Sequence, residues 1–155
     1  MVIWINGAFG VGKTTAAEHL VQRIAGSRLV DPERIGYLMR RTLWRSVDYQ
    51  EVSLWRRLTA RRIASAAKKG TVIVPMTVVN RAVFDEITRH ARVFALVACR
   101  ETIEDRIAAG DEAHEWRRQN LDRCLAALED AAFGEHITTD GCTPGEVADL
   151  ILARL

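Results

Sequence analysis

The chain has 155 residues, 48% hydrophobic and 27% charged, which is typical of one globular domain. Its net charge of +2 gives no reason to expect a nucleic-acid partner, and no apolar run approaches the roughly 18 residues of a membrane span. Three widely spaced cysteines argue against a disulfide framework or a zinc site and favour buried thiols. We therefore expect a cytoplasmic enzyme or binding protein without a stable membrane anchor.

Apolar, β-favouring residues open the chain. Met1–Ile5 has the pattern of a buried parallel strand, and apolar residues at helical spacing follow over about 13–25. A short strand at Arg28–Val30 stops at Asp31, which is favoured at the N-cap of a helix, and Pro32 is favoured at the first helical position. The first third of the chain is thus predicted to run strand, helix, strand, helix.

The same alternation continues to the end of the sequence. The later elements are predicted as a helix over about 50–69, a strand at 71–74, a helix near 81–90, a strand at 92–97, helices over 101–109 and 115–131, a strand at 136–138 and a terminal helix from 143. Five short strands separated by helices predict a single α/β domain over residues 1–155, with a five-stranded parallel sheet and helices on both faces. Ligands of such sheets bind beyond the carboxyl ends of the strands.

A glycine-rich stretch, INGAFGVGKTTAAEHL at residues 5–20, joins the first strand to the first helix. Gly7, Gly12, Lys13 and Thr14 satisfy the phosphate-loop pattern G-x-x-x-x-G-K-[ST]. Backbone N–H groups and the helix N-terminus would surround an anion, while Lys13 reaches the outer phosphates and Thr14 places its hydroxyl on Mg²⁺. The predicted nucleotide-binding residues are Gly7, Ala8, Phe9, Gly10, Val11, Gly12, Lys13, Thr14 and Thr15.

Phosphoryl transfer also needs a group that orients the attacking hydroxyl or completes the metal site. The strands ending at Pro75 and Ala98 supply no carboxylate, so motor ATPases fit poorly, and the sequence lacks the N/T-K-x-D signature of GTPases. Asp31, at the end of the second strand, could act as general base or bind the metal, directly or through water. It could also only cap the following helix. The two roles are compatible because a capping carboxylate keeps one oxygen free.

Arginines flank a break in the helical pattern at residues 110–112. Arg106 precedes the break and Arg123 follows it. A helix–loop–helix here would form a lid, over about 107–120, that closes on the nucleotide and stabilises the transferred phosphoryl group. The predicted catalytic residues are therefore Lys13, Asp31, Arg106 and Arg123.

Arginine and aromatic residues are also frequent between the second and third strands. Two helices over about 32–69 would form an arm that binds the acceptor, with aromatic faces on a base or sugar and guanidinium groups on its oxygens. Aromatic residues at helical spacing could equally belong to the core. The candidate substrate-binding residues of this region are Asp31, Arg40, Trp55 and Arg56.

Seven stretches along the chain are similar to the TmrB-type tunicamycin resistance family, which lies within the nucleoside-monophosphate-kinase-like P-loop kinases. They are IWINGAFG at 3–10, DPE at 31–33, LWR at 54–56, VPMT at 74–77, ET at 101–102, DRC at 122–124 and HI at 136–137. The resemblance covers nearly the whole chain. It implies ATP as the nucleotide, protection against tunicamycin, and contact of Met76 and Thr77 with the acceptor.

Three functions remain open at this point. A kinase-like enzyme would transfer the γ-phosphoryl group of ATP to a hydroxyl of tunicamycin, an acylated uracil nucleoside, or of a related uridine compound. A binding protein would use ATP to sequester the drug unchanged. A small-molecule or nucleotide kinase would act on another acceptor. Members of the family can continue into an amphipathic tail, whereas this sequence ends at Leu155, so we expect at most weak peripheral membrane contact.

Overall fold

The structure, a computed structural model, describes residues 1–33, 49–109 and 114–155. Its centre is a five-stranded parallel sheet in the order β2-β3-β1-β4-β5. The strands are β1 (Val2–Gly7), β2 (Arg28–Leu29), β3 (Val72–Pro75), β4 (Arg92–Val97) and β5 (Glu135–Thr138). The predicted five-stranded parallel sheet is confirmed, and β1 is its central strand.

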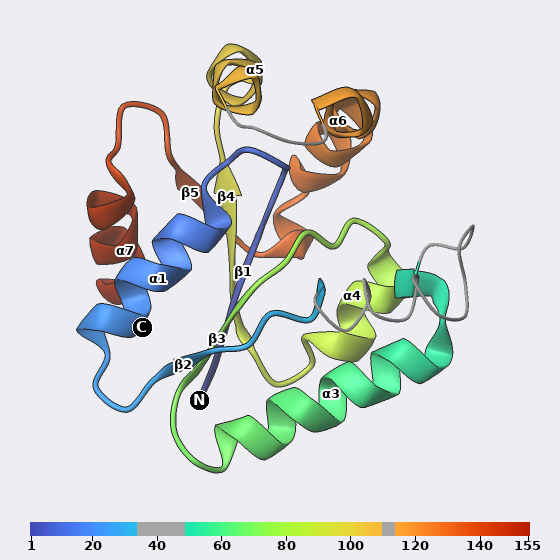
Figure 1. Cartoon of the computed structure of the whole chain (residues 1–155), viewed down its shortest axis with the longest axis vertical. Helices are drawn as coiled ribbons and strands as arrows, with labels where there is room; N and C mark the ends of the chain where they lie inside the picture. Colours follow the sequence, from blue (N-terminus) through green and yellow to red (C-terminus); the bar gives the residue numbers. More distant parts are fainter. Residues whose placement is uncertain (34–48, 110–113) are drawn as a thin grey trace.

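Helices cover the sheet on both sides (Figure 1). One side carries α1 and α7, the other carries α3 and α4, and α5 and α6 lie near the carboxyl ends of β1 and β4. The helices are α1 (Lys13–Arg23), α3 (Ser53–Ala67), α4 (Arg81–Ile87), α5 (Arg100–Ala108), α6 (His114–Leu128) and α7 (Pro144–Leu152). Two short 3₁₀ helices, η1 (Tyr49–Glu51) and η2 (Ala131–Phe133), complete the described elements.

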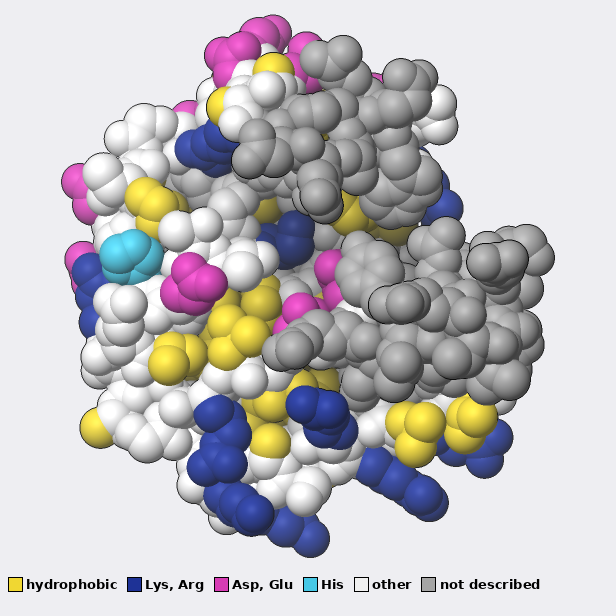
Figure 2. Space-filling view, in the orientation of Figure 1, with side chains coloured by type: hydrophobic (Ala, Val, Ile, Leu, Met, Phe, Trp, Pro, Cys, Tyr) yellow, Lys and Arg dark blue, Asp and Glu magenta, His cyan; other side chains and the backbone are white. Residues whose placement is uncertain are grey.

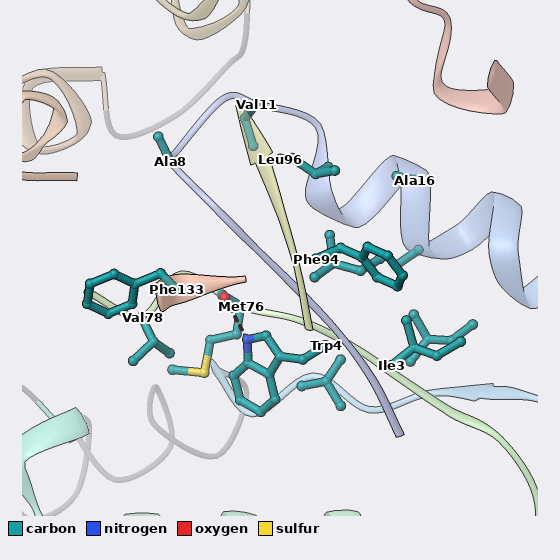
Figure 3. Close-up of a cluster of buried hydrophobic side chains, with 14 of the residues drawn as sticks. Ile3, Trp4, Ala8, Val11, Ala16, Met76, Val78, Phe94, Leu96 and Phe133 are labelled. Carbon is teal, nitrogen blue, oxygen red and sulfur yellow. Dashed lines mark hydrogen bonds between the residues drawn. The ribbon is translucent and has the colours of Figure 1, made fainter. Parts of the chain in front are cut away.

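The core is built around β1. Ile3, Trp4 and Ile5 are fully buried because β1 has a neighbouring strand on each edge and helices on each face. The ring nitrogen of Trp4 donates a hydrogen bond to the Met76 carbonyl at 3.3 Å (Figure 3). An apolar strand with one polar atom satisfied in this way is the pattern expected of a buried parallel sheet.

Two predicted helix starts can be compared with the structure. The Asp31 carboxylate accepts the backbone N–H of Glu33 at 2.9 Å, as expected for an N-cap. At α7, Thr143 and Glu146 form a reciprocal capping box. The segments 34–48 and 110–113, which contain Arg40 and the centre of the predicted lid, lie outside the described residues.

The expectation of buried thiols holds for one of the three cysteines. Cys124 is buried, Cys142 is half-buried and Cys99 is exposed. Cys99 differs because it stands before α5, at the carboxyl edge of the sheet rather than inside a helix face. Within the described ranges, no helix has the length and apolar character needed to cross a membrane.

Candidate functional site

The phosphate loop connects the end of β1 to the start of α1. Its glycines have positive φ angles of 148° at Gly7, 82° at Gly10 and 99° at Gly12. A Cβ atom at Gly7 would lie 2.7 Å from Val11 Cγ1, and one at Gly10 would lie 2.8 Å from Ile107 Cγ1. The loop is therefore packed tightly from behind, by its own turn and by α5, and only glycine fits at these positions.

The front of the loop is open to solvent. Gly12, Thr14 and Thr15 are exposed, whereas Ala8 and Val11 are buried. The Lys13 ammonium group donates to the Ala8 carbonyl at 2.8 Å and lies 5.7 Å from the centre of the Phe9 ring. An exposed hydroxyl, an ammonium group and glycine backbone at a helix N-terminus fit a polyphosphate with a divalent cation. In the described part of the chain, no group of three His, Cys, Asp or Glu side chains is arranged to hold a metal ion.

Asn6 is a functional residue that the sequence reasoning missed. Its side chain is fully buried, and its Oδ1 atom accepts the N–H groups of Gly7 and Val78, both at 2.9 Å. Its Nδ2 atom donates to the carbonyls of Val78 at 3.0 Å and Phe133 at 3.4 Å. Asn6 thus fixes the first residue of the phosphate loop to the segment after β3 and to η2. The sequence signal that could have indicated this role is an asparagine within an otherwise apolar strand.

Met76 and Thr77, which were predicted to contact the acceptor, follow directly after β3. Both are buried, with 0% and 4% of their surface exposed. The Thr77 hydroxyl donates to the Gly7 carbonyl at 2.8 Å, and the Thr77 carbonyl accepts from the Gln50 amide at 3.0 Å. In this structure Thr77 holds the start of the phosphate loop, Met76 bonds to β1, and direct contact of either residue with an acceptor stays a prediction.

Trp55 and Arg56 are likewise engaged within the protein. Trp55 is fully buried, and its ring nitrogen donates to the Pro32 carbonyl at 3.3 Å, next to Asp31. Arg56 pairs with Glu86 of α4 at 2.6 Å and donates to two carbonyls of η1. A buried ring offers no face to a ligand, so the structure gives Trp55 the role of holding the Asp31–Pro32 turn in place of the predicted stacking.

Arg106 joins two loops at the carboxyl edge of the sheet. Its guanidinium group donates to the Val11 carbonyl at 3.2 Å, to the Thr139 hydroxyl at 3.0 Å and to the Thr139 carbonyl at 3.1 Å. The phosphate loop is therefore tied to the segment after β5. Arg106 acts in this structure as a positioning residue, and a catalytic role for it stays a prediction.

Arg123 lies on α6 and is exposed. The adjacent Cys124 is buried, and burial raises the pKa of its thiol above the ordinary value. The positive charges of Lys13 and Arg123 act in the opposite direction on the same thiol. Arg123 affects this thiol as its neighbour in the chain, and a catalytic role for Arg123 stays a prediction.

Asp140 supports the segment after β5. Its carboxylate accepts the Cys99 N–H at 2.9 Å. A hydrogen bond from the Thr102 hydroxyl, followed by that from Cys99, holds the pKa of Asp140 below its usual value, with a smaller contribution from Arg106. Thr139 and Asp140 were not assigned a role from the sequence, and Arg106 was predicted to be catalytic rather than to bond to this segment. The sequence signal that could have indicated this network is the placement of Thr139 and Asp140 directly after a strand.

A phosphate loop after the central strand of a β2-β3-β1-β4-β5 parallel sheet defines a kinase-like P-loop protein. The AAA domain family matches residues 2–131, and the chain belongs to this family. The fold and this match together imply nucleotide binding. A search of curated proteins found no match.

The chain also belongs to the family of tunicamycin resistance proteins. The structure of the Deinococcus radiodurans tunicamycin resistance protein matches with a TM-score of 0.80 and 30% identity, covering 99% of this chain and 94% of that chain. The family predicted from the sequence is therefore confirmed.

Two further solved structures agree in fold. A sugar kinase from a Janibacter species has a TM-score of 0.73 at 18% identity, covering 98% of this chain and 92% of that chain. The shikimate kinase of Acinetobacter baumannii has a TM-score of 0.69 at 19% identity, covering 99% of this chain and 91% of that chain. At these identities the likeness concerns the fold alone.

Proposed function

We propose that the protein binds ATP with Mg²⁺ and transfers the γ-phosphoryl group to a hydroxyl of tunicamycin or a related uridine compound. The observation that carries the proposal is the phosphate loop itself, packed from behind and open in front, with Lys13 across it. The family to which the chain belongs supplies the acceptor class. The arm over about 32–69, with Arg40, and the lid over about 107–120 stay predictions within this proposal.

Each residue of the site has a defined task in the transfer. The backbone of Gly7–Gly12 binds the phosphates, and Lys13 exchanges the Ala8 carbonyl for the outer phosphate oxygens. The Thr14 hydroxyl would hold Mg²⁺, which would neutralise part of the phosphate charge. The acceptor oxygen forms a bond to the γ-phosphorus, the bond from that phosphorus to the bridging oxygen of ADP breaks, and Asp31 takes the hydroxyl proton. Arg123 faces the charge that develops on the phosphoryl group.

A second candidate function is ATP-dependent sequestration of the drug. The observation in its favour is that β3 ends at Pro75 and β4 at Val97, so neither neighbour of β1 places a carboxylate beside the phosphate loop. This function predicts protection in proportion to the amount of protein, with unmodified drug recovered from the complex. A third function, transfer to another acceptor, is separated by thermal shifts with uridine compounds and other antibiotics.

The deciding experiment is mass spectrometry of tunicamycin after incubation with the protein, ATP and Mg²⁺. We expect the drug to gain one phosphoryl group. Lys13→Ala should lower the rate by about 100- to 1000-fold, as for the loss of one donor that stabilises the transition state, whereas Lys68→Ala, an exposed lysine after α3, should change nothing. Unmodified drug bound tightly would establish sequestration, and neither binding nor modification would refute tunicamycin as the ligand.

A further inference from the structure

A cavity of about 580 Å³ lies between α5, α6 and the edge of the sheet formed by β4 and β5. The two helices lie side by side beyond the carboxyl end of β4 (Figure 1). The lining is mostly apolar and includes Leu96 of β4, Ile103 of α5, and Leu125 and Leu128 of α6. A mostly apolar hollow of this volume is typical of sites that bind small molecules. We call it the α5–α6 cavity.

One face of α6 lines the α5–α6 cavity. Asp122, Leu125, Ala126 and Glu129 all belong to the lining, and their spacing of three, four and seven residues puts them on the same side of the helix. Arg100 of α5, also in the lining, forms an ion pair with Asp122 and so links the two helices. The lining therefore comes from several elements around one hollow, which suits a compact molecule better than an extended peptide.

The α5–α6 cavity reaches the phosphate loop from its buried side. Ala8 belongs to the lining and is 2% exposed. Ile103 also belongs to it, and its carbonyl oxygen would lie 3.3 Å from a Cβ atom at Gly10. Thr14 and Thr15, at the open front of the loop, are not part of the lining. An occupant of the cavity therefore leaves the front of the loop accessible.

The surroundings of the α5–α6 cavity are acidic. Residues 100–130, which include α5 and α6, hold nine of the 20 Asp and Glu and five of the 22 Lys and Arg, a net charge of −4. The rest of the chain carries +6, since the whole chain is at +2. Figure 2 shows Asp and Glu side chains gathered at the top of the molecule, where Figure 1 places α5. Such a field attracts a cation and repels an anion.

Glu129 is the charged group of the lining with which a ligand can pair. Arg100 already pairs with Asp122 and, at 3.3 Å, with Glu104. Glu129 is exposed and forms no ion pair or side-chain hydrogen bond with the residues that the structure describes. His136 of β5, also in the lining, can donate or accept a further hydrogen bond. A cationic group that enters the cavity thus meets an uncompensated carboxylate.

We propose that the α5–α6 cavity binds a small molecule with an apolar ring system and a cationic amine. The ring system lies against Leu96, Ile103 and Leu125, because its apolar surface leaves water there. The amine donates a charge-assisted hydrogen bond to Glu129. A hydrophobic acid could use the same apolar lining, but the acidic surroundings disfavour it. Nucleotide binding and phosphoryl transfer take no part in this argument, so the proposal stands or falls separately from the proposed function.

The test is calorimetric titration of the nucleotide-free protein with 2-naphthylmethylamine, 2-naphthylmethanol and 2-naphthoate, which share a ring system and differ in charge. We expect the amine to bind about tenfold more tightly than the alcohol, as for the gain of one hydrogen bond to a charged group, and the acid to bind most weakly. Saturating ATP with Mg²⁺ should leave the affinity for the amine within about twofold, because the front of the phosphate loop lies outside the cavity.

Two variants locate the probe in the α5–α6 cavity. Glu129→Gln should weaken binding of the amine about tenfold and leave the alcohol unchanged. Its control, Glu18→Gln, makes the same change in charge at an exposed acid of α1, outside the lining, and should leave binding of the amine within about twofold. Leu125→Trp fills the cavity and should weaken binding of the amine and the alcohol by about tenfold or more. Thermal unfolding of each variant confirms that it is folded.

Several results would overturn the proposal. One is an amine that binds no more tightly than the alcohol or the acid. Another is an affinity for the amine that Glu129→Gln or Leu125→Trp leaves unchanged. Displacement of the amine by ATP would place the probe in the nucleotide site instead of the cavity. Absence of binding by all three probes at millimolar concentration would likewise rule out the proposed ligand class.

Discussion

The phosphate side and the acceptor side of this site agree with the sequence to different degrees. On the phosphate side, Gly7, Gly12, Lys13 and Thr14 lie where the motif places them, with an open front. On the acceptor side, Trp55, Met76 and Thr77 are buried, and their hydrogen bonds go to the Asp31–Pro32 turn, to β1 and to the phosphate loop. A motif fixed by the shape of its ligand can be recognised directly. Aromatic and polar residues near a site can instead be buried and support the site without contacting a ligand.

The largest effect is expected for Asp31, the residue that links the two sides. Asp31→Asn keeps an N-cap acceptor but removes the proton acceptor, so transfer should fall about 1000-fold with ATP affinity almost unchanged. Single-turnover transfer and ATP titration measure the two quantities. Asp85→Asn, at an exposed acid of α4, is the matched control. Full activity in Asp31→Asn would remove Asp31 from the mechanism and leave it only as a cap.

The next largest effect is expected for Asn6, because its side chain bonds both to the phosphate loop and to the segment after β3. Asn6→Ala leaves the buried N–H groups of Gly7 and Val78 without their partner, and we expect the free energy of unfolding to fall by about 3 kcal/mol. Denaturant titration measures this change. Asn80→Ala is the control, because Asn80 also accepts two backbone N–H groups, at the start of α4, and its loss should cost only about 1 kcal/mol. Equal losses of unfolding free energy in the two variants would mean that the hydrogen bonds of Asn6 stabilise the protein no more than a helix N-cap does.

Gly10 tests how tightly the phosphate loop is packed from behind. Gly10→Ala combines a φ of 82° with a contact of 2.8 Å to Ile107, so we expect a loss of about 2 kcal/mol together with weaker nucleotide binding. Gly26→Ala has a similar φ of 71° and nothing within 4 Å, and should lose about 1 kcal/mol with normal nucleotide binding. Thermal unfolding and ATP titration distinguish the two. Equal stability losses and equal nucleotide binding in the two variants would show that α5 does not pack tightly against the phosphate loop.

The smallest effect concerns acid stability at the end of β5. Because the pKa of Asp140 is lowered in the folded protein, its ionised form stabilises the fold above about pH 4, near its unfolded value, and this contribution disappears as the pH falls through the folded pKa. Asp140→Asn should therefore lower the melting temperature slightly at pH 7, and this difference should shrink as the pH falls below about 4. Thr102→Val should shift the wild-type acid transition upward. A difference in melting temperature that does not shrink with falling pH would assign the effect to packing.

Sequence alone predicted the sheet, its parallel strands and the phosphate loop. These follow from apolar runs, from helix caps and from a motif that acts through backbone geometry. It did not predict what Asn6, Arg106 and Asp140 do, because each has hydrogen-bond partners far along the chain, 127 residues away for Asn6, 33 for Arg106 and 41 for Asp140. Nor could helical spacing tell whether Trp55 faces a ligand or the core, because that depends on which element packs against it.

The order of the strands has a consequence for how the protein is made. β1 is the first strand of the chain, yet its two neighbours are β3, paired from Val72, and β4, paired from Arg92. During synthesis, β1 emerges some 70 residues before β3 and some 90 residues before β4. Domain folding therefore waits for most of the chain, and until then the apolar residues of β1 are exposed to chaperones or to other nascent chains.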